Sequence, residues 1–153
     1  MKTLAFWCIA LAACGESIEG EEVGPGTLTL HYGSESPKLE VGAAVQSADM
    51  PDKMLVMFGT NHIDCDSDFE NDFPGNGTYV YFSVAKMPGT YASTYTDILK
   101  IEPRSLHSNG TSSGMVVIDA VEPRVTGSLT VMTTDDDAGT LSAEGTFDVV
   151  RCF

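Results

Sequence analysis

Segments in which hydrophobic and polar residues alternate with a period of two recur from residue 26 to the end of the chain. Because successive side chains of a strand point to opposite faces, this period predicts half-buried β-strands. The clearest example is TLTLHY, in which Leu28, Leu30 and Tyr32 alternate with threonine and histidine. Gly, Pro, Asn and Asp bound the alternating stretches, as is typical of turns. The predicted strands span 27–32, 37–46, 53–58, 78–84, 96–101, 115–121, 125–134 and 139–152.

Two connections and one buried strand follow from the same pattern. KMLVMF (53–58) is apolar at both parities, which is typical of a central strand covered on both sides. Asn109-Gly110 predicts a loop before 115–121, and Asp135-Asp136-Asp137-Ala138 predicts a hairpin turn. No stretch of ten or more residues has a clean helical period. The pattern predicts an all-β fold, a single antiparallel β-sandwich of about eight strands.

Composition adds the expected number of domains and the net charge to this picture. The 153 residues predict one domain, and 42% apolar residues are enough for a packed core. Eight Lys and Arg against 22 Asp and Glu give a net charge of −14. This balance argues against nucleic acid as a partner and against electrostatic docking on an anionic membrane, since both need clustered cations. It favours cations, basic proteins or basic polymers, although solubility alone explains the same charge.

The first fourteen residues, MKTLAFWCIALAAC, predict a processing segment rather than part of the fold. Their apolar run, 4–13, is too short to span a bilayer as a permanent helix. Leu11-Ala12-Ala13-Cys14 resembles the lipobox of bacterial lipoproteins: a leucine, two small residues and a cysteine. The resemblance implies cleavage before Cys14, a thioether-linked diacylglycerol on its sulfur and acylation of the new amine. A signal peptide without lipidation and a buried strand are the alternatives.

The same resemblance predicts the organisation of the chain and its address. Residues 1–13 are the signal peptide, 14–25 the lipidated cysteine with a flexible acidic tether, and 26–153 the β-sandwich domain. Gly15, rather than Asp, follows the cysteine, which implies transport to the outer membrane of a Gram-negative bacterium. Several acyl chains give stable anchoring in the lipid bilayer. The closing GTFDVVRC also resembles, more weakly, the end of small exported β-sandwich lipoproteins of uncharacterised function.

Cleavage and lipidation leave two of the four cysteines for the folded domain. Cys8 leaves with the signal peptide and Cys14 takes the lipid. Cys65 and Cys152 are then an even pair in an oxidising compartment, which predicts one disulfide between them.

The stretch HIDCDSDFENDF (62–73) is the candidate metal site. Its carboxylates recur at every second position, and calcium accepts six to eight such oxygens in flexible geometry. The register of an EF-hand loop fails, because Phe69 stands where the sharp turn needs glycine. Cys65, Phe69 and Phe73 share the other side, which predicts that they point inward while the carboxylates lie in water. The calcium hypothesis therefore rests on Asp64, Asp66, Asp68, Glu70 and Asp72, with 135–137 as a second acidic stretch.

Signs of catalysis are weak. Gly110-Thr111-Ser112-Ser113-Gly114 satisfies G-x-S-x-G, but a nucleophile elbow needs a helix after it and a histidine downstream, and His107 is the last histidine. The single tryptophan, Trp7, lies in the signal peptide, so tyrosines would have to form any sugar-stacking platform. We expect a non-enzymatic binding or envelope-structural module that contacts another envelope protein or polymer. The alternatives are a calcium- or carbohydrate-binding domain and, less favoured, a hydrolase.

Overall fold

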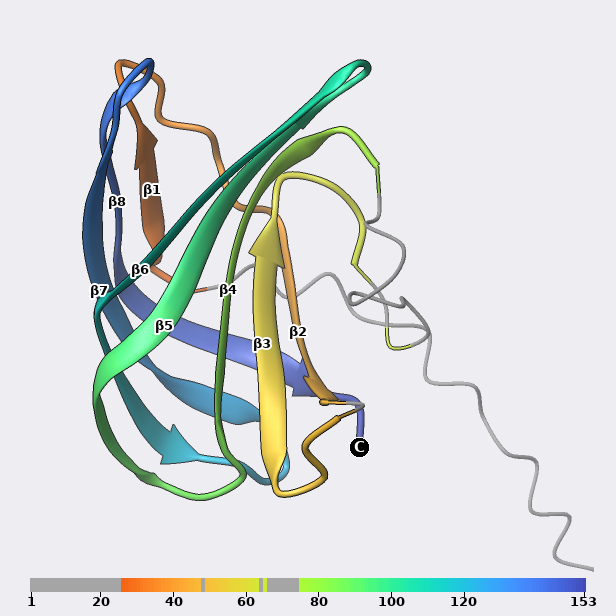
Figure 1. The fold of residues 1–153 in the computed structure, drawn as a ribbon. Helices are drawn as coiled ribbons and strands as arrows, with labels where there is room; N and C mark the ends of the chain where they lie inside the picture. Colours follow the sequence, from red (N-terminus) through yellow and green to blue (C-terminus); the bar gives the residue numbers. More distant parts are fainter. Residues whose placement is uncertain (1–25, 48, 64, 66–74) are drawn as a thin grey trace, which may run out of the picture.

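A computed structural model describes residues 26–47, 49–63, 65 and 75–153, and the fold is reported for these residues (Figure 1). They form strands and no helix, and none of them belongs to a helix long and apolar enough to cross a bilayer. The eight strands are β1 (Thr29–Tyr32), β2 (Val41–Gln46), β3 (Lys53–Gly59), β4 (Gly77–Ala85), β5 (Gly89–Glu102), β6 (Ser105–Ala120), β7 (Val125–Asp135) and β8 (Gly139–Arg151).

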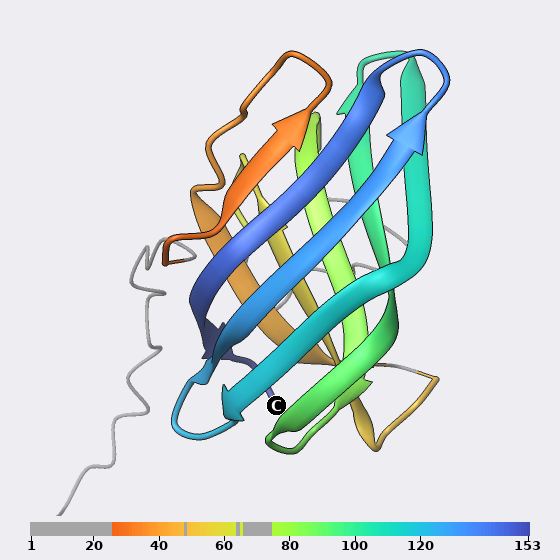
Figure 2. The same ribbon diagram turned by 90° about the vertical axis from the view of Figure 1, so that its left-hand side faces the viewer.

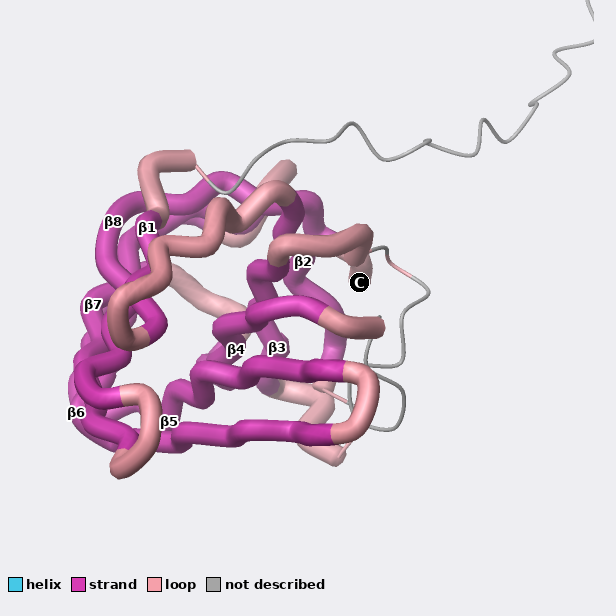
Figure 3. Tube along the Cα trace, turned by 90° about the horizontal axis from the view of Figure 1, so that it is seen from above, coloured by secondary structure: helices cyan, strands magenta, loops and turns pink. Residues whose placement is uncertain are grey.

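All eight strands belong to one sheet. From β2 to β8, each strand pairs antiparallel with the next one in sequence, and β1 pairs antiparallel with β8. The end of β8 also pairs parallel with β2, through Ala43↔Val150 and Ala44↔Arg151. Seen from above, the strands follow one another around a shared interior (Figure 3). The all-β prediction is confirmed, and the sheet is mixed because this one pairing is parallel.

The interior is filled by apolar side chains from all eight strands. At its centre, the rings of Phe58 (β3), Phe82 (β4) and Phe147 (β8) lie with centroids 5.3–6.2 Å apart. Figure 2 shows β8 crossing in front of β2, β3 and β4, so Phe147 reaches the other two rings across the interior. These tilted ring pairs are a favourable aromatic arrangement and join the two sides of the core.

A second apolar cluster covers the opposite face of β3, β4 and β5. It is built around Met57, Tyr79 and Leu99, all of which are buried, and Ile63 packs onto it from the segment that follows β3. Residues Met54–Phe58 are therefore buried at every position. The prediction that 53–58 is covered on both sides is confirmed.

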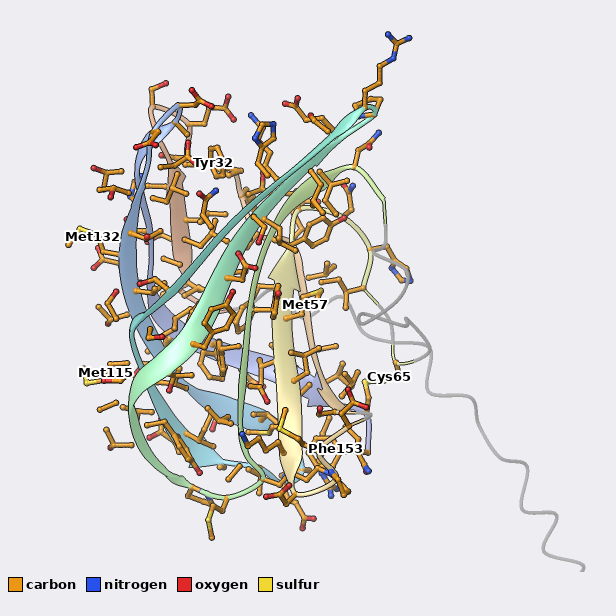
Figure 4. The ribbon with its side chains drawn as sticks, viewed as in Figure 1. Tyr32, Met57, Cys65, Met115, Met132 and Phe153 are labelled. Atoms are coloured by element: carbon orange, nitrogen blue, oxygen red, sulfur yellow. A yellow bond between two sulfur atoms is a disulfide. The ribbon has the colours of Figure 1, made fainter. Side chains whose placement is uncertain are left out.

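The predicted disulfide joins Cys65 to Cys152 across 87 positions of sequence, with 5.2 Å between the two Cα atoms. It ties the segment after β3 to the end of β8, where the Cys152 N–H donates to the carbonyl of Ala44. The expectation that Cys65 points inward is wrong, because this residue is exposed at the edge of the molecule (Figure 4). Phe69 and Phe73 lie outside the described residues.

Two strands are longer than the sequence predicts. β5 begins at Gly89 instead of residue 96, and β6 begins at Ser105 instead of residue 115. The predicted loop at Asn109-Gly110 is wrong, because both residues pair with β5 and the turn lies at Pro103-Arg104. The acidic turn is confirmed: Asp135 Oδ1 accepts the N–H groups of Asp137 and Ala138. Gly139 follows at φ +81°, a conformation that favours glycine.

Candidate functional site: a groove between β4 and β5

The sheet opens between β4 and β5. The pairing of these strands ends at Phe82↔Thr96, and the first half of β5 pairs only with β6. The change follows two register shifts next to Ser93, which has a positive φ of 57°. The Thr94 hydroxyl donates to the carbonyl of Tyr91 at 2.9 Å and holds this bend. As a result the β4–β5 connection forms a wide arch at the bottom of Figure 1.

A groove of about 700 Å³ occupies this opening, a volume in the usual range of small-molecule sites. Tyr81 lies on its β4 side, and Tyr91 and Tyr95 lie on its β5 side. We call it the tyrosine groove after these three residues. Its described lining includes Ser83, Thr90 and Thr94 as hydroxyl groups, and Lys53 is the one charged side chain in that lining.

The three tyrosines are held in different ways. The Tyr91 hydroxyl donates to the carbonyl of Met87 at 2.7 Å, which fixes its ring inside the arch. Tyr95 is 55% exposed and lies over the backbone of Gly110, where a Cβ atom would collide with the phenol oxygen. The Tyr91 ring therefore forms a fixed wall of the groove. Tyr95 lies at the rim of the groove, and most of one face of its ring is open to solvent.

Tyr81 is fixed by a buried carboxylate. Asp97 is 2% exposed, and its carboxylate accepts hydrogen bonds from the Tyr81 hydroxyl at 3.1 Å and from the Ser108 hydroxyl at 2.6 Å. The N–H of Asn109 donates to its other oxygen at 2.8 Å. These three donors compensate the burial of the charge. Burial raises the pKa of Tyr81, and the neighbouring Asp97 raises it further, so the phenol stays neutral.

One lining residue has unused hydrogen-bonding capacity. The Ser83 hydroxyl is buried without a hydrogen-bond partner. Most buried hydroxyl groups have a partner, so this one is an unsatisfied polar group in the wall of the groove. The site therefore combines aromatic rings with neutral hydroxyls, which suits binding of a neutral polar molecule.

The described lining of the groove contains none of the residues predicted from the sequence as sites. Cys14 and the candidate calcium ligands Asp64, Asp66, Asp68, Glu70 and Asp72 are outside the described residues. Within the described part of the chain, no group of three or more His, Cys, Asp and Glu side chains is placed to hold a metal ion. The G-x-S-x-G string lies in strand β6, where the Ser113 hydroxyl donates to the carbonyl of Met132. It has neither the turn nor the following helix of a nucleophile elbow.

Sequence reasoning missed the tyrosine groove. The tyrosines at 81, 91 and 95 have no spacing that marks a site, and only the separation of β4 from β5 brings them together. The one sequence signal is composition: residues 26–153 contain no tryptophan, so their tyrosines are the largest aromatic side chains available for a binding surface. Comparison with known proteins gives no matching family model, no matching curated protein and no matching solved structure.

Proposed function

We propose that the chain is an exported, lipid-anchored binding protein and that the tyrosine groove is its ligand site. The single observation that supports binding is the groove itself: about 700 Å³ between two strands, lined by three tyrosines and several hydroxyls. Concave sites with aromatic walls and a few placed polar groups are typical of ligand binding. The proposed role is non-enzymatic, because the groove offers surfaces for contact rather than a nucleophile with its base.

A neutral carbohydrate is the ligand class that this lining favours. The apolar faces of sugar rings pack on aromatic side chains, and their hydroxyls exchange hydrogen bonds with Ser, Thr and Tyr. Ser83 offers an unsatisfied hydroxyl, and the exposed ring of Tyr95 offers a stacking surface. The groove is open along its length between β4 and β5, which suits a segment of an envelope polymer.

Two features of the chain support lipid anchoring in the cell envelope. Leu11-Ala12-Ala13-Cys14 has the lipobox pattern, and the residues from 15 to 25 are rich in Gly and Glu, as suits a tether. The Cys65–Cys152 disulfide is typical of an oxidising compartment outside the cytoplasm. We place the protein at the outer membrane of a Gram-negative bacterium, with its domain held off the bilayer.

The domain itself we propose to be a β-sandwich in which two sides of the sheet pack on each other. The phenylalanine contacts support this arrangement, because Phe147 of β8 packs on Phe58 and Phe82, which lie on strands that β8 does not pair with. In a sandwich the tyrosine groove opens at the margin of this shared core, because its lining residue Val84 belongs to the core and Tyr91 packs against it.

Replacing the rim tyrosine is expected to weaken carbohydrate binding. On an array of neutral oligosaccharides, Tyr95→Ala should bind at least about tenfold more weakly than the unchanged protein, because the stacking ring is lost. Tyr95→Phe keeps the ring and should bind within about threefold. Met115→Ala, at an exposed position on β6 outside the groove lining, is the control and should bind normally. Absence of binding to every glycan, or equal binding by Tyr95→Ala, would contradict the carbohydrate proposal.

Lipid attachment depends on one sulfur atom. In bacteria grown with radioactive palmitate, the unchanged chain should become labelled and shift to its processed mass, whereas Cys14→Ser should show neither change. Cys8→Ser is the matched control, because it alters a cysteine of the proposed signal peptide, and it should be labelled normally. Labelling that persists in Cys14→Ser would show that the lipobox interpretation is wrong.

A further inference from the structure

Strand β6 has an open edge. It pairs with β5 along nearly its whole length, but its pairing with β7 begins only at Met115↔Thr130. The Ser113 hydroxyl donates to the carbonyl of Met132 at 2.8 Å, at the point where β6 and β7 separate. Beyond it, the tips of the β5–β6 and β7–β8 hairpins diverge at the top of Figure 1. Within the described residues, 106–111 and 114 therefore have a strand partner on one side only, and the register shift leaves 112 and 113 without one.

The free backbone groups of this edge can be assigned from the register. Glu102 and Ser105 pair around the two-residue turn, and N–H and C=O groups alternate in direction along an antiparallel strand. Leu106, Ser108 and Gly110 therefore direct their N–H and C=O groups away from β5. Natural sheets often protect such edges with lysine or proline, but 106–114 (LHSNGTSSG) contain neither.

A pocket lies in the opening beside this edge. Its volume is about 190 Å³, and its lining comes from both sides of the opening: Lys100, Glu102 and His107 from the β5–β6 hairpin, Asp135 and Asp137 from the β7–β8 turn, and Tyr32 from β1. We call this pocket the acidic mouth. Tyr32 lies near the top of the molecule, between β1 and β6 (Figure 4). Burial raises the pKa of Tyr32, and the negative charge of Asp135 raises it further, so the field of the turn reaches the pocket.

The acidic mouth already holds one ammonium group. The Lys100 Nζ lies 3.2 Å from Glu35 Oε2, 3.6 Å from Glu102 Oε1 and 5.3 Å from the centre of the Tyr32 ring. Carboxylates and an aromatic face thus recognise a cation within the chain itself. Further carboxylates at this end, on Asp135, Asp136 and Asp137, belong to the turn and form no ion pair with a basic side chain among the described residues.

We infer that this opening binds an extended, basic segment of a partner protein, which adds as a strand to the edge of β6 at Leu106, Ser108 and Gly110. Strand addition supplies affinity through main-chain hydrogen bonds, and pockets for alternate side chains supply specificity. The acidic mouth takes Lys or Arg side chains of the segment. Charge complementarity decides the occupant: a second copy of this chain has a net charge of −14, and its residues 15–25 are also acidic, so both are repelled.

The test uses the full-length protein in detergent and a fluorescent eight-residue peptide of alternating threonine and lysine. We expect saturable binding that weakens at least about tenfold when ionic strength rises from about 0.05 to 0.5 M. A peptide with glutamate in place of lysine should not bind. A lysine peptide that is N-methylated at alternate residues should bind at least about tenfold more weakly, because it cannot complete the strand ladder. Equal binding by the glutamate or the N-methylated peptide would overturn the proposal.

Two matched variants locate the site on the protein. Leu106→Pro removes an N–H that points away from β5 and should weaken binding of the lysine peptide at least about tenfold, whereas Leu106→Thr keeps the N–H and should bind within about twofold. Unchanged binding by Leu106→Pro would overturn the assignment of the edge. Light scattering provides the remaining test: a dimer that Leu106→Pro dissociates would show a second copy on this edge and would also overturn the proposal.

Discussion

Removing the Cys65–Cys152 disulfide is expected to lower the free energy of unfolding by about 4–5 kcal/mol, the largest effect we expect from a single change. The cross-link closes a loop of 87 positions, and a long loop loses much conformational entropy in the unfolded chain when its ends are joined. In the native state it ties the segment after β3 to Cys152, which directly follows β8. The last residues of β8, Val150 and Arg151, form the parallel pairing with β2.

Cys65→Ser is the cleanest variant for this measurement. Cys65 is exposed, so serine leaves no cavity, and the change in stability reports the lost cross-link. In urea unfolding experiments, reductant should lower the free energy of unfolding of the unchanged protein by the same amount as the Cys65→Ser substitution does. Reductant should not change the free energy of unfolding of Cys65→Ser. A decrease below about 1 kcal/mol would show that the cross-link contributes little beyond what the sheet supplies.

Phe58→Ala is expected to cost about 3–5 kcal/mol of stability. Phe58 is fully buried, and its ring packs against Phe82 and Phe147 with centroids 6.2 and 5.3 Å away. Alanine removes both ring contacts and leaves a cavity at the point where β3, β4 and β8 meet. The surrounding strands are fixed by their pairings, so the cavity cannot close fully.

Thermal and urea unfolding of three proteins test this expectation. Phe58→Leu fills part of the space and should lose less than Phe58→Ala, whereas Met115→Ala should change stability by less than about 0.5 kcal/mol. Met115 is 48% exposed and points away from the ribbon into solvent (Figure 4). Equal losses for Phe58→Ala and Met115→Ala would mean that the phenylalanine cluster is not the centre of the core.

Burial explains which parts of the fold the sequence predicts. Strand β3 is recognised because every position from Met54 to Phe58 is buried, and the β7–β8 hairpin because Asp135 and Gly139 suit a tight turn. The disulfide follows from counting cysteines, when Cys8 and Cys14 are set aside as the resemblance to a lipobox implies. These features are local, or depend on few residues, so pattern reasoning reaches them.

The missed strand segments share a different physical property. Residues 89–95 and 105–114 have few buried apolar side chains, so they lack the alternation that identifies a strand. They extend because residues 89–94 pair with 114–118 of β6 and residues 105–111 pair with 96–102 of β5. Polar residues such as Asn109 look like turn signals in the sequence, yet the ladder holds them extended. Tertiary pairing here overrides local propensity.

Each of the two proposed binding surfaces lies where the pairing of two neighbouring strands ends. β4 separates from β5 at the end of the molecule that holds the tyrosine groove, and β6 separates from β7 at the opposite end, beside the acidic mouth (Figure 1). The register of long-range pairing sets where each separation begins, and no single stretch of sequence encodes it. A sequence pattern could therefore predict the strands and still miss the sites between them.

Ligand binding in the tyrosine groove can be tested directly by an NMR titration. The ¹⁵N-labelled protein is titrated with the neutral oligosaccharide that binds most tightly on the array. We expect saturable shifts of amide signals in residues 81–85 of β4 and 90–95 of β5, with no shifts in β7 or the β7–β8 turn. Unshifted signals along both lining segments, or shifts confined to the opposite end of the sheet, would contradict ligand binding in the groove.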